Sequence, residues 1–302
     1  MKKLRFLVSL TNDDNDYQIE QASATDEAAR KLGVSAQIIY AGNDAITQST
    51  QLLQAIQSAP QDRPDAILFE PVGSTALPQV ARAAINAGIG WVVLNRDANY
   101  VNELRALKKA PIFTISADHL EIGRIQGKQF NALLPKGGYI LYIQGPSENS
   151  AAKDRTTGMM ETKRANIQVT ALKGQWTEES SQKAVRSWLK LTTSQKAVID
   201  LIGAQDDSMA IGARKAFQEL SNESDRDRWL KLPFTGCDGL PKTGQAWVKS
   251  GLLSATVYSP PNTGLAMEML VQNVQNGKEL PERALVEPSS IPGLNELRPK
   301  LA

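Results

Sequence analysis

The sequence predicts an α/β fold built from two similar, doubly wound units. Short apolar segments alternate with helical segments along nearly the whole chain, a pattern typical of parallel sheets with helices on both faces. About eleven strands are predicted, which is more than one open sheet comfortably holds. A chain of 302 residues is also long enough to divide into two domains. Two α/β units therefore fit the sequence better than one.

The first half of the chain holds five predicted strands, most of which lead into a helix. The strands span residues 6–10, 37–40, 66–69, 91–94 and 112–115. Helices are predicted over 17–32, 46–57 and 77–87, each between two of these strands. The first helix should end at Gly33, and its apolar spacing predicts a buried face formed by Ile19, Ala22, Ala29 and Leu32.

The same alternation restarts after Ser116-Ala117, where the boundary between the units is expected. Asp118 is predicted to cap a helix that runs through Leu133. The later strands are predicted over 139–143, 168–172, 198–202, 233–236, 253–258 and 284–286. The later helices are predicted over 151–164, 181–191, 208–220, 243–250 and 263–276.

Composition excludes several classes of function. The formal net charge is +2, and no block of Lys and Arg indicates a nucleic-acid partner. One Cys and one His leave no internal disulfide and no Cys-rich zinc site, and we expect no cofactor. No apolar run reaches the ~20 residues that span a bilayer. Residues 1–10 are interpreted as the first strand rather than a signal peptide, which fits a cytoplasmic chain or a mature form whose export signal was removed.

Polar and aromatic residues follow the predicted strands. Because ligands of open α/β sheets bind at the carboxyl ends of the strands, these residues are the candidate site. Three of them, Asn15, Tyr17 and Gln18, come after the first strand. The other candidates in the first half of the chain are Glu70, Asn95, Arg96 and His119, and those in the second half are Arg155, Trp176, Asp206, Asp238 and Ser259. Planar carboxylate, amide and guanidinium groups match neighbouring sugar hydroxyls, and an aromatic ring covers the apolar face of a sugar. The set predicts a site for a neutral sugar or polyol.

Sequence signals for catalysis are weak. The first strand leads into Thr-Asn-Asp-Asp-Asn-Asp, which lacks the glycines of a phosphate-binding loop, and there is no G-x-S-x-G nucleophile elbow. The acidic residues Asp13, Asp14, Asp16 and Glu70 could in principle bind magnesium. Arg96 and Arg155 are expected near them, which favours paired recognition of a ligand over metal binding.

The chain resembles periplasmic sugar-binding proteins of the ribose-binding type, whose fold is shared by the effector domains of LacI-family regulators. The landmarks that match are Lys31-Leu32-Gly33, Leu94-Asn95-Arg96, Ala117-Asp118-His119, Ser150-Ala151-Ala152 with Arg155 and Gly158, Asp206-Asp207-Ser208-Met209-Ala210, Gly236-Cys237-Asp238-Gly239 and Ala255-Thr256-Val257. They are spread over nearly the whole chain, and together they are far more specific than any one of them.

This resemblance implies two Rossmann-like lobes joined by a three-stranded hinge, with the ligand between them. The N-terminal lobe would contain 1–116 and 259–286, and the C-terminal lobe 117–258 and 287–302. The resemblance implies a monomer that delivers its ligand to an ABC transporter permease, with a chemoreceptor as a further candidate partner, and it implies no reaction.

Several residues depart from the pattern of the ribose-binding type. Asn95 stands where an Asp is usual, His119 where an Asn is common, and Asp206 where an Asn is common. Ser259, or its neighbour Tyr258, stands where a hinge Gln is usual. Of the two adjacent acids, Asp206 is expected to contact the ligand and Asp207 to cap the helix that begins at Ser208. These departures favour a sugar or polyol other than ribose.

Two alternatives from other classes remain open on the sequence alone. The first is the sensing domain of a LacI-like regulator without its DNA-reading part, which would lie in the cytoplasm. The second is a carboxylate-dependent carbohydrate enzyme that uses Glu70 and the acidic residues 13–16.

Overall fold

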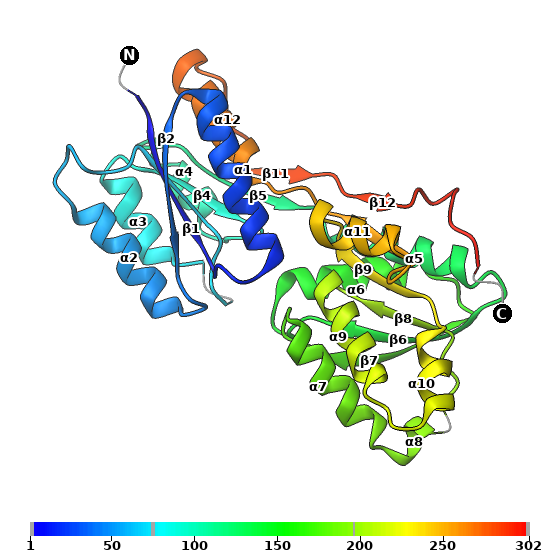
Figure 1. The fold of residues 1–302 in the computed structure, drawn as a ribbon. Coiled ribbons are helices and arrows are strands. Elements are labelled where there is room, and N and C mark those ends of the chain that lie inside the picture. Colours follow the sequence, from blue (N-terminus) through cyan, green and yellow to red (C-terminus); the bar gives the residue numbers. More distant parts are fainter. Residues whose placement is uncertain (1–2, 74–75, 196, 300–302) are drawn as a thin grey trace. The chain divides into compact units, whose positions relative to one another are not determined.

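The computed structural model describes residues 3–73, 76–195 and 197–299. The chain forms two compact units, of which the first combines Met1–Ala117 with Pro261–Val286 and the second combines Asp118–Pro260 with Glu287–Ala302 (Figure 1). The chain therefore passes between the units after Ala117, after Pro260 and after Val286. The limits expected from the sequence lay after residues 116, 258 and 286.

The first unit contains a six-stranded sheet in the order β11-β5-β4-β3-β1-β2, and every neighbouring pair is parallel. Its strands are β1 (Arg5–Leu10), β2 (Ser35–Tyr40), β3 (Ala66–Phe69), β4 (Gly90–Leu94), β5 (Ile112–Ala117) and β11 (Arg283–Val286). Its helices are α1 (Asp16–Leu32), α2 (Ala45–Gln57), α3 (Pro78–Asn86), α4 (Val101–Arg105) and α12 (Thr263–Asn276). The parallel doubly wound sheet predicted from the sequence is confirmed.

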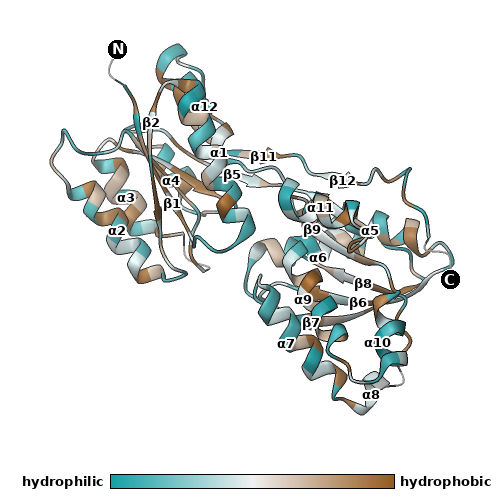
Figure 2. Cartoon of the chain, viewed as in Figure 1, coloured by the Kyte–Doolittle hydropathy of each residue, from teal (hydrophilic) through white to brown (hydrophobic). Residues whose placement is uncertain are grey.

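Helices cover both faces of this sheet, as the near-continuous apolar strands require. Because successive side chains of a strand point to opposite faces, Phe6 and Val8 of β1 pack with α1 and α12, whereas Leu7 packs with α2 and α3. In Figure 2, hydrophobic residues mark strand β1, and the helices of both units carry hydrophilic as well as hydrophobic residues.

The second unit repeats this design with the order β12-β10-β9-β8-β6-β7. All neighbouring pairs are parallel except β10 and β12, which are antiparallel. Its strands are β6 (Gly138–Gln144), β7 (Ile167–Lys173), β8 (Leu201–Ala204), β9 (Phe234–Asp238), β10 (Ala255–Tyr258) and β12 (Ser289–Ile291). Its helices are α5 (His119–Leu133), α6 (Ser150–Thr162), α7 (Glu178–Leu189), α8 (Thr192–Gln195), α9 (Asp207–Gln218), α10 (Glu223–Leu230), the π-helical turn η1 (Pro241–Gln245) and α11 (Ala246–Lys249).

Four short elements were not predicted, and one predicted strand is displaced. The helices α4, α8 and α10 and the strand β12 are too short to show a clear apolar period. The strand predicted over 198–202 lies over Leu201–Ala204. Val198 is exposed, so the apolar residues before Leu201 do not all belong to the sheet.

The buried face of α1 differs from the prediction. Ile19 is 48% exposed, whereas the fully buried positions of this helix are Gln18, Gln21, Thr25 and Ala28. Ala22, Ala29 and Leu32 pack against the edge of the core, as predicted. A helix that buries three polar side chains must give them hydrogen-bond partners inside the protein, and these partners shape the candidate site.

Glycines allow α5 and α6 to pack backbone against backbone. A Cβ atom added to Gly158 of α6 would lie 2.0 Å from the carbonyl oxygen of Leu120, and one added to Gly123 of α5 would lie 2.1 Å from the carbonyl oxygen of Arg155. Both obstacles are main-chain atoms that cannot rotate away. This contact therefore fixes the position of Arg155 on α6.

Replacing Gly158 with alanine should lower stability by about 2 kcal/mol, because overpacking a tight contact typically costs about 1–3 kcal/mol. Thermal unfolding should show a fall in Tm of several degrees. Gly264 in α12 is a matched control, because a Cβ there meets its nearest atom at 3.5 Å. G264A should keep or raise the Tm through better helix propensity. Equal effects of the two substitutions would contradict a specific role of the α5–α6 contact.

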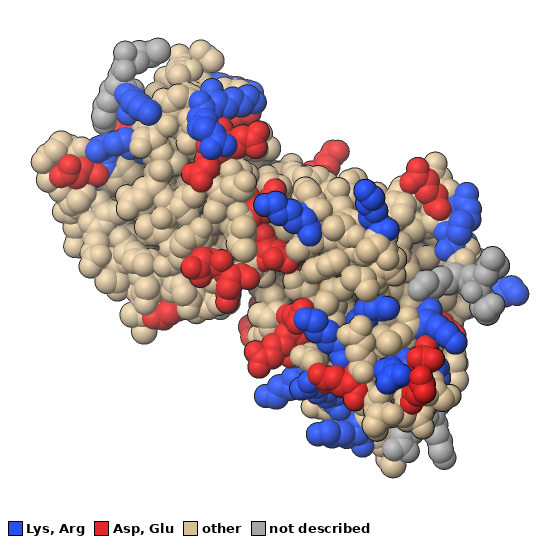
Figure 3. Space-filling model, in the orientation of Figure 1, with Lys and Arg blue, Asp and Glu red and all other residues tan. Residues whose placement is uncertain are grey.

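Charged side chains of both signs are spread over the surface drawn in Figure 3, in keeping with a formal net charge of +2. Among the described residues, no helix has both the length and the apolar character needed to cross a bilayer.

Candidate functional site

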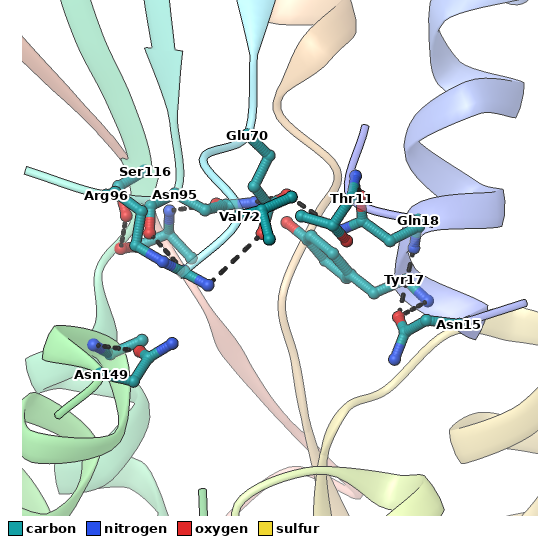
Figure 4. A network of polar contacts seen from close by, with 12 residues as sticks. Thr11, Asn15, Tyr17, Gln18, Glu70, Val72, Asn95, Arg96, Ser116 and Asn149 are labelled. Atoms are coloured by element: carbon teal, nitrogen blue, oxygen red, sulfur yellow. Dashed lines mark hydrogen bonds and ion pairs between the residues drawn. The ribbon is translucent and has the colours of Figure 1, made fainter. Parts of the chain in front are cut away.

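Glu70 is the centre of a buried polar network in the first unit (Figure 4). It directly follows β3 and is only 5% exposed. Its Oε2 accepts hydrogen bonds from Gln18 Nε2 at 2.9 Å and from Asn95 Nδ2 at 3.0 Å. Its Oε1 lies 3.7 Å from the guanidinium of Arg96. Four of the residues predicted from strand ends are thus brought together at the carboxyl edge of this sheet.

Asn95 is held in a fixed orientation by its neighbours. It lies after β4 with φ of 56°, a left-handed conformation that Asn tolerates better than most residues. Its Oδ1 accepts from Asn262 Nδ2 at 2.6 Å and from the backbone N–H of Ala117 at 3.4 Å. The oxygen is therefore used inside the protein, and the amide nitrogen faces Glu70.

Gln21 and Asn262 extend this network and were missed by the sequence analysis. Gln21 Nε2 donates to Asn262 Oδ1 at 2.8 Å, while Gln21 Oε1 accepts from the backbone N–H groups of Asn262 and Thr263. Gln21 thus caps the start of α12 from a neighbouring helix, since Asn262 makes no side-chain cap of its own. The available signal was the spacing of Gln18, Gln21 and Thr25, which places polar groups on one face of α1.

Asn15 and Tyr17 lie at the start of α1. Asn15 is the N-cap, and its Oδ1 accepts from the backbone N–H of Tyr17 at 2.9 Å and of Gln18 at 3.3 Å. Gln18 is also held by the backbone N–H of Thr11, which donates to its Oε1 at 3.0 Å. Tyr17 is half-buried and lies in the close-up of Figure 4 between Glu70 and Asn15.

Arg155 is the centre of the second unit's polar set. Its side chain is 7% exposed. It donates to the carbonyl oxygen of Gln205 and to Nδ1 of His119, the latter at 3.4 Å. It also pairs with Asp238 Oδ1 at 3.5 Å, and its Cζ lies 5.5 Å from the centre of the Trp176 ring. On the surface of α6, Glu161 pairs with Arg124.

Asp206, and not Asp207 as expected from the sequence, caps the helix α9. Because α9 begins at Asp207 rather than Ser208, Asp206 is the N-cap, and its Oδ1 accepts from the backbone N–H of Met209 at 2.5 Å. The expectation that Asp207 caps this helix is therefore wrong. Asp207 is buried and binds Thr256 and Gly239 instead.

The remaining predicted residues of the second unit also lie at strand ends. Trp176 follows β7 with φ of 62° and packs against the core of this unit. The backbone N–H of Ser259, after β10, donates to the carbonyl oxygen of Asp238 at 2.9 Å, and its buried Oγ has no hydrogen-bond partner among the described residues. Cys237 is buried, and burial raises the pKa of its thiol well above the usual value, so it stays a packed, protonated side chain.

Among the described residues, no group of three or more His, Cys, Asp or Glu side chains is arranged to hold a metal ion. Glu70, the best-placed carboxylate of the metal alternative, already accepts two amide donors and faces Arg96. Glu70 therefore serves as a fixed acceptor that orients the amide and guanidinium groups around it.

Comparison with known proteins places the chain in a family. The sequence matches the periplasmic binding protein domain over residues 6–279. The D-allose-binding periplasmic protein of Escherichia coli K12 is 23% identical over 283 residues, which cover 91% of this chain and 86% of that protein. The ribose import binding protein RbsB of the same strain is 25% identical over 259 residues, which cover 86% and 79%.

Solved structures share the fold. A periplasmic solute-binding protein of an ABC transporter from Actinobacillus succinogenes 130z, with bound D-allose, superposes with a TM-score of 0.80 at 20% identity, covering 95% of this chain and 97% of that one. The Caulobacter myo-inositol-binding protein, bound to myo-inositol, has a TM-score of 0.78 at 20% identity and covers 97% and 95%. With the family match over most of its length, the chain belongs to the periplasmic binding protein domain family.

Proposed function

We propose that the protein is the solute-binding component of an ABC-type importer and binds a monosaccharide or polyol. The observation that carries the proposal is Arg155, a buried guanidinium that combines a carboxylate partner, Asp238, with the face of Trp176. A guanidinium and a carboxylate bind adjacent hydroxyls in one plane, and an indole ring covers the apolar side of a sugar ring. The names of the relatives, which include D-allose- and ribose-binding proteins, support this class of ligand.

Each unit would supply one half of the contacts. The first unit offers donors from Asn95 and Arg96, whose positions are fixed by Glu70. The second offers the donors of Arg155 and the acceptors of Asp206 and Asp238. A ligand held by both sets would stabilise a closed arrangement of the units over an open one. The chain segments after Ala117, Pro260 and Val286 would act as the hinge.

No reaction is part of this proposal. The protein would act as a monomer in the periplasm and deliver its ligand to a membrane permease, in agreement with its family. Neither a regulatory nor a catalytic role has a specific observation in its favour.

Isothermal titration calorimetry of refolded protein, freed from any copurified ligand, tests the proposal. The panel is D-allose, D-ribose, D-galactose, D-fructose, L-arabinose and myo-inositol, with L-glutamine as a non-sugar control. We expect at least one sugar or polyol to bind with a Kd of about 1 μM or tighter, near −8 kcal/mol, and L-glutamine not to bind. Folded protein that binds no member of the panel would contradict the proposal, and so would slow chemical conversion of a bound sugar.

A further inference from the structure

Asp207 is a buried carboxylate that the proposed ligand contacts do not use. It is the first residue of α9 and is 3% exposed. Its Oδ1 accepts from the hydroxyl of Thr256 at 2.7 Å, and its Oδ2 accepts from the backbone N–H of Gly239 at 2.7 Å. The side chain therefore connects α9 with β10 and with the turn that follows β9.

Glycines make room for this carboxylate. A Cβ atom added to Gly236 would lie 2.2 Å from Asp207 Oδ1, and one added to Gly244 would lie 2.1 Å from Oδ2. Main chain thus closes around the carboxyl group from β9 and from η1. The group is enclosed on several sides and has a fixed place in the fold.

The turn that Asp207 binds is the one that carries Asp238. Asp238 has φ of 93°, and Gly239 follows with φ of 58°. For a residue with a side chain, such a backbone conformation costs about 1–3 kcal/mol of stability, and it persists only where the surrounding structure holds it. The bond from Gly239 N–H to Asp207 is a direct constraint on this backbone.

We propose that Asp207 is a positioning residue that holds the Asp238–Gly239 turn in its left-handed conformation and so presents the Asp238 carboxylate to Arg155 and to the ligand. The proposal rests on the proposed function, because it assigns Asp238 to the ligand site. Asp238 Oδ1 lies 3.5 Å from the Arg155 guanidinium, a geometry that a different backbone at residue 238 would not give.

The charged and titratable groups close to Asp207 determine which substitution can keep its two contacts. Asp206, Asp238, Cys237 and Arg155 belong to the same electrostatic cluster. Burial raises the pKa of Asp207 well above its usual value, and the charge of Asp238 raises it further. When Asp207 is protonated, Oδ1–H can donate to Thr256 while Oδ2 still accepts from Gly239. Asparagine can make the same two contacts.

The test compares D207N and D207A by calorimetric titration with the tightest ligand of the panel. D207N should bind within about threefold of the unchanged protein, whereas D207A should bind at least about tenfold more weakly, equivalent to about 1.4 kcal/mol. In a D238A background, D207A should have little further effect, because Asp207 acts through Asp238. Rescue by asparagine together with this non-additivity would not be produced by a general loss of packing.

Asp200 provides the matched control. Its Oδ2 accepts from the backbone N–H of Tyr139 at 2.8 Å and lies 2.6 Å from a Cβ added to Gly138. It belongs to the same unit but lies at the amino ends of β6 and β8. D200A should lower the Tm and leave the Kd unchanged. The positioning role is overturned if D207A binds as tightly as the unchanged protein, or if D207A and D238A are additive. If the unchanged, folded protein binds no sugar or polyol, the proposed function fails instead.

Discussion

Replacing Arg155 with methionine is expected to weaken ligand binding at least about 100-fold. Hydrogen bonds to charged groups contribute about 1.5–3 kcal/mol each, and the loss of two such bonds to a sugar exceeds the 2.7 kcal/mol that corresponds to 100-fold. Methionine keeps much of the apolar stem of arginine, so it fills the space between His119 and Trp176 without the charge. Calorimetric titration with the tightest ligand of the panel measures the effect.

The same substitution should also lower stability, because it leaves the Asp238 carboxylate without its cation. Breaking a fully buried pair costs about 3–5 kcal/mol. Because the Asp238 side chain is 19% exposed, solvent should reduce this cost to about 2–3 kcal/mol. The affinity of R155K should lie between those of the unchanged protein and of R155M, since lysine keeps the charge but not the planar fork of donors.

Arg186 is the control for this prediction. It pairs with Glu219 on the surface, where the two side chains are 50% and 45% exposed. R186M should change stability by less than about 1 kcal/mol, as is usual for exposed ion pairs, and should leave affinity unchanged. Arg155 would not be a ligand-binding residue if R155M were folded and bound the ligand as tightly as R186M.

Most of the fold could be predicted because its signals are local. Strands such as Ala66–Phe69 are fully buried on both faces, and their apolar runs stand out in the sequence. Asp118 caps α5 and Gly33 ends α1 as predicted, since both depend only on neighbouring residues. The error at Asp206 and Asp207 shows the limit, because two adjacent acids can each cap a helix and only the position of the first turn decides between them.

The candidate site was predictable at strand ends but not in the layer behind them. Glu70 and Asn95 follow parallel strands at their carboxyl edge, and this position made them candidates. Arg155 lies on the helix after a strand, and its ligand role was also predicted from the resemblance to the sugar-binding family. Gln21 and Asn262 are 241 residues apart in sequence and meet only in the folded unit. Ile19 has the stronger apolar signal on α1 but lies exposed, because the polar partners offered by α12 make burial of Gln21 favourable.

Replacing Gln21 with leucine is expected to give a large loss of stability. Gln21 is fully buried, and its amide serves Asn262 Oδ1 and the backbone N–H groups of Asn262 and Thr263. Each buried polar group left without a partner costs about 1–3 kcal/mol. With three such groups, and with partial relaxation of the structure around them, Q21L should lower the free energy of unfolding by about 3–5 kcal/mol. Urea unfolding followed by circular dichroism measures this loss.

The loss should extend to ligand binding, because Asn262 holds the Asn95 amide that faces Glu70. If Asn262 shifts, Asn95 loses its shortest hydrogen bond and is held only by Glu70 and the backbone N–H of Ala117, so its amide should be less firmly oriented for a ligand. Q182L is the control: Gln182 is partly buried on α7 and bonds only Glu219 among the described contacts, so this substitution should change the free energy of unfolding by less than about 0.5 kcal/mol.

A double substitution separates the network from simple packing. Replacing both partners of a buried hydrogen bond with apolar groups costs much less than removing one. Q21L/N262L should therefore be more stable than the sum of the single effects predicts, by about 1–3 kcal/mol, while its affinity stays low because Asn95 still lacks the hydrogen bond from Asn262. If the loss of unfolding free energy in the double variant equals the sum of the two single losses, Gln21 and Asn262 do not act together. Normal affinity in the double variant would show that Asn95 does not depend on them.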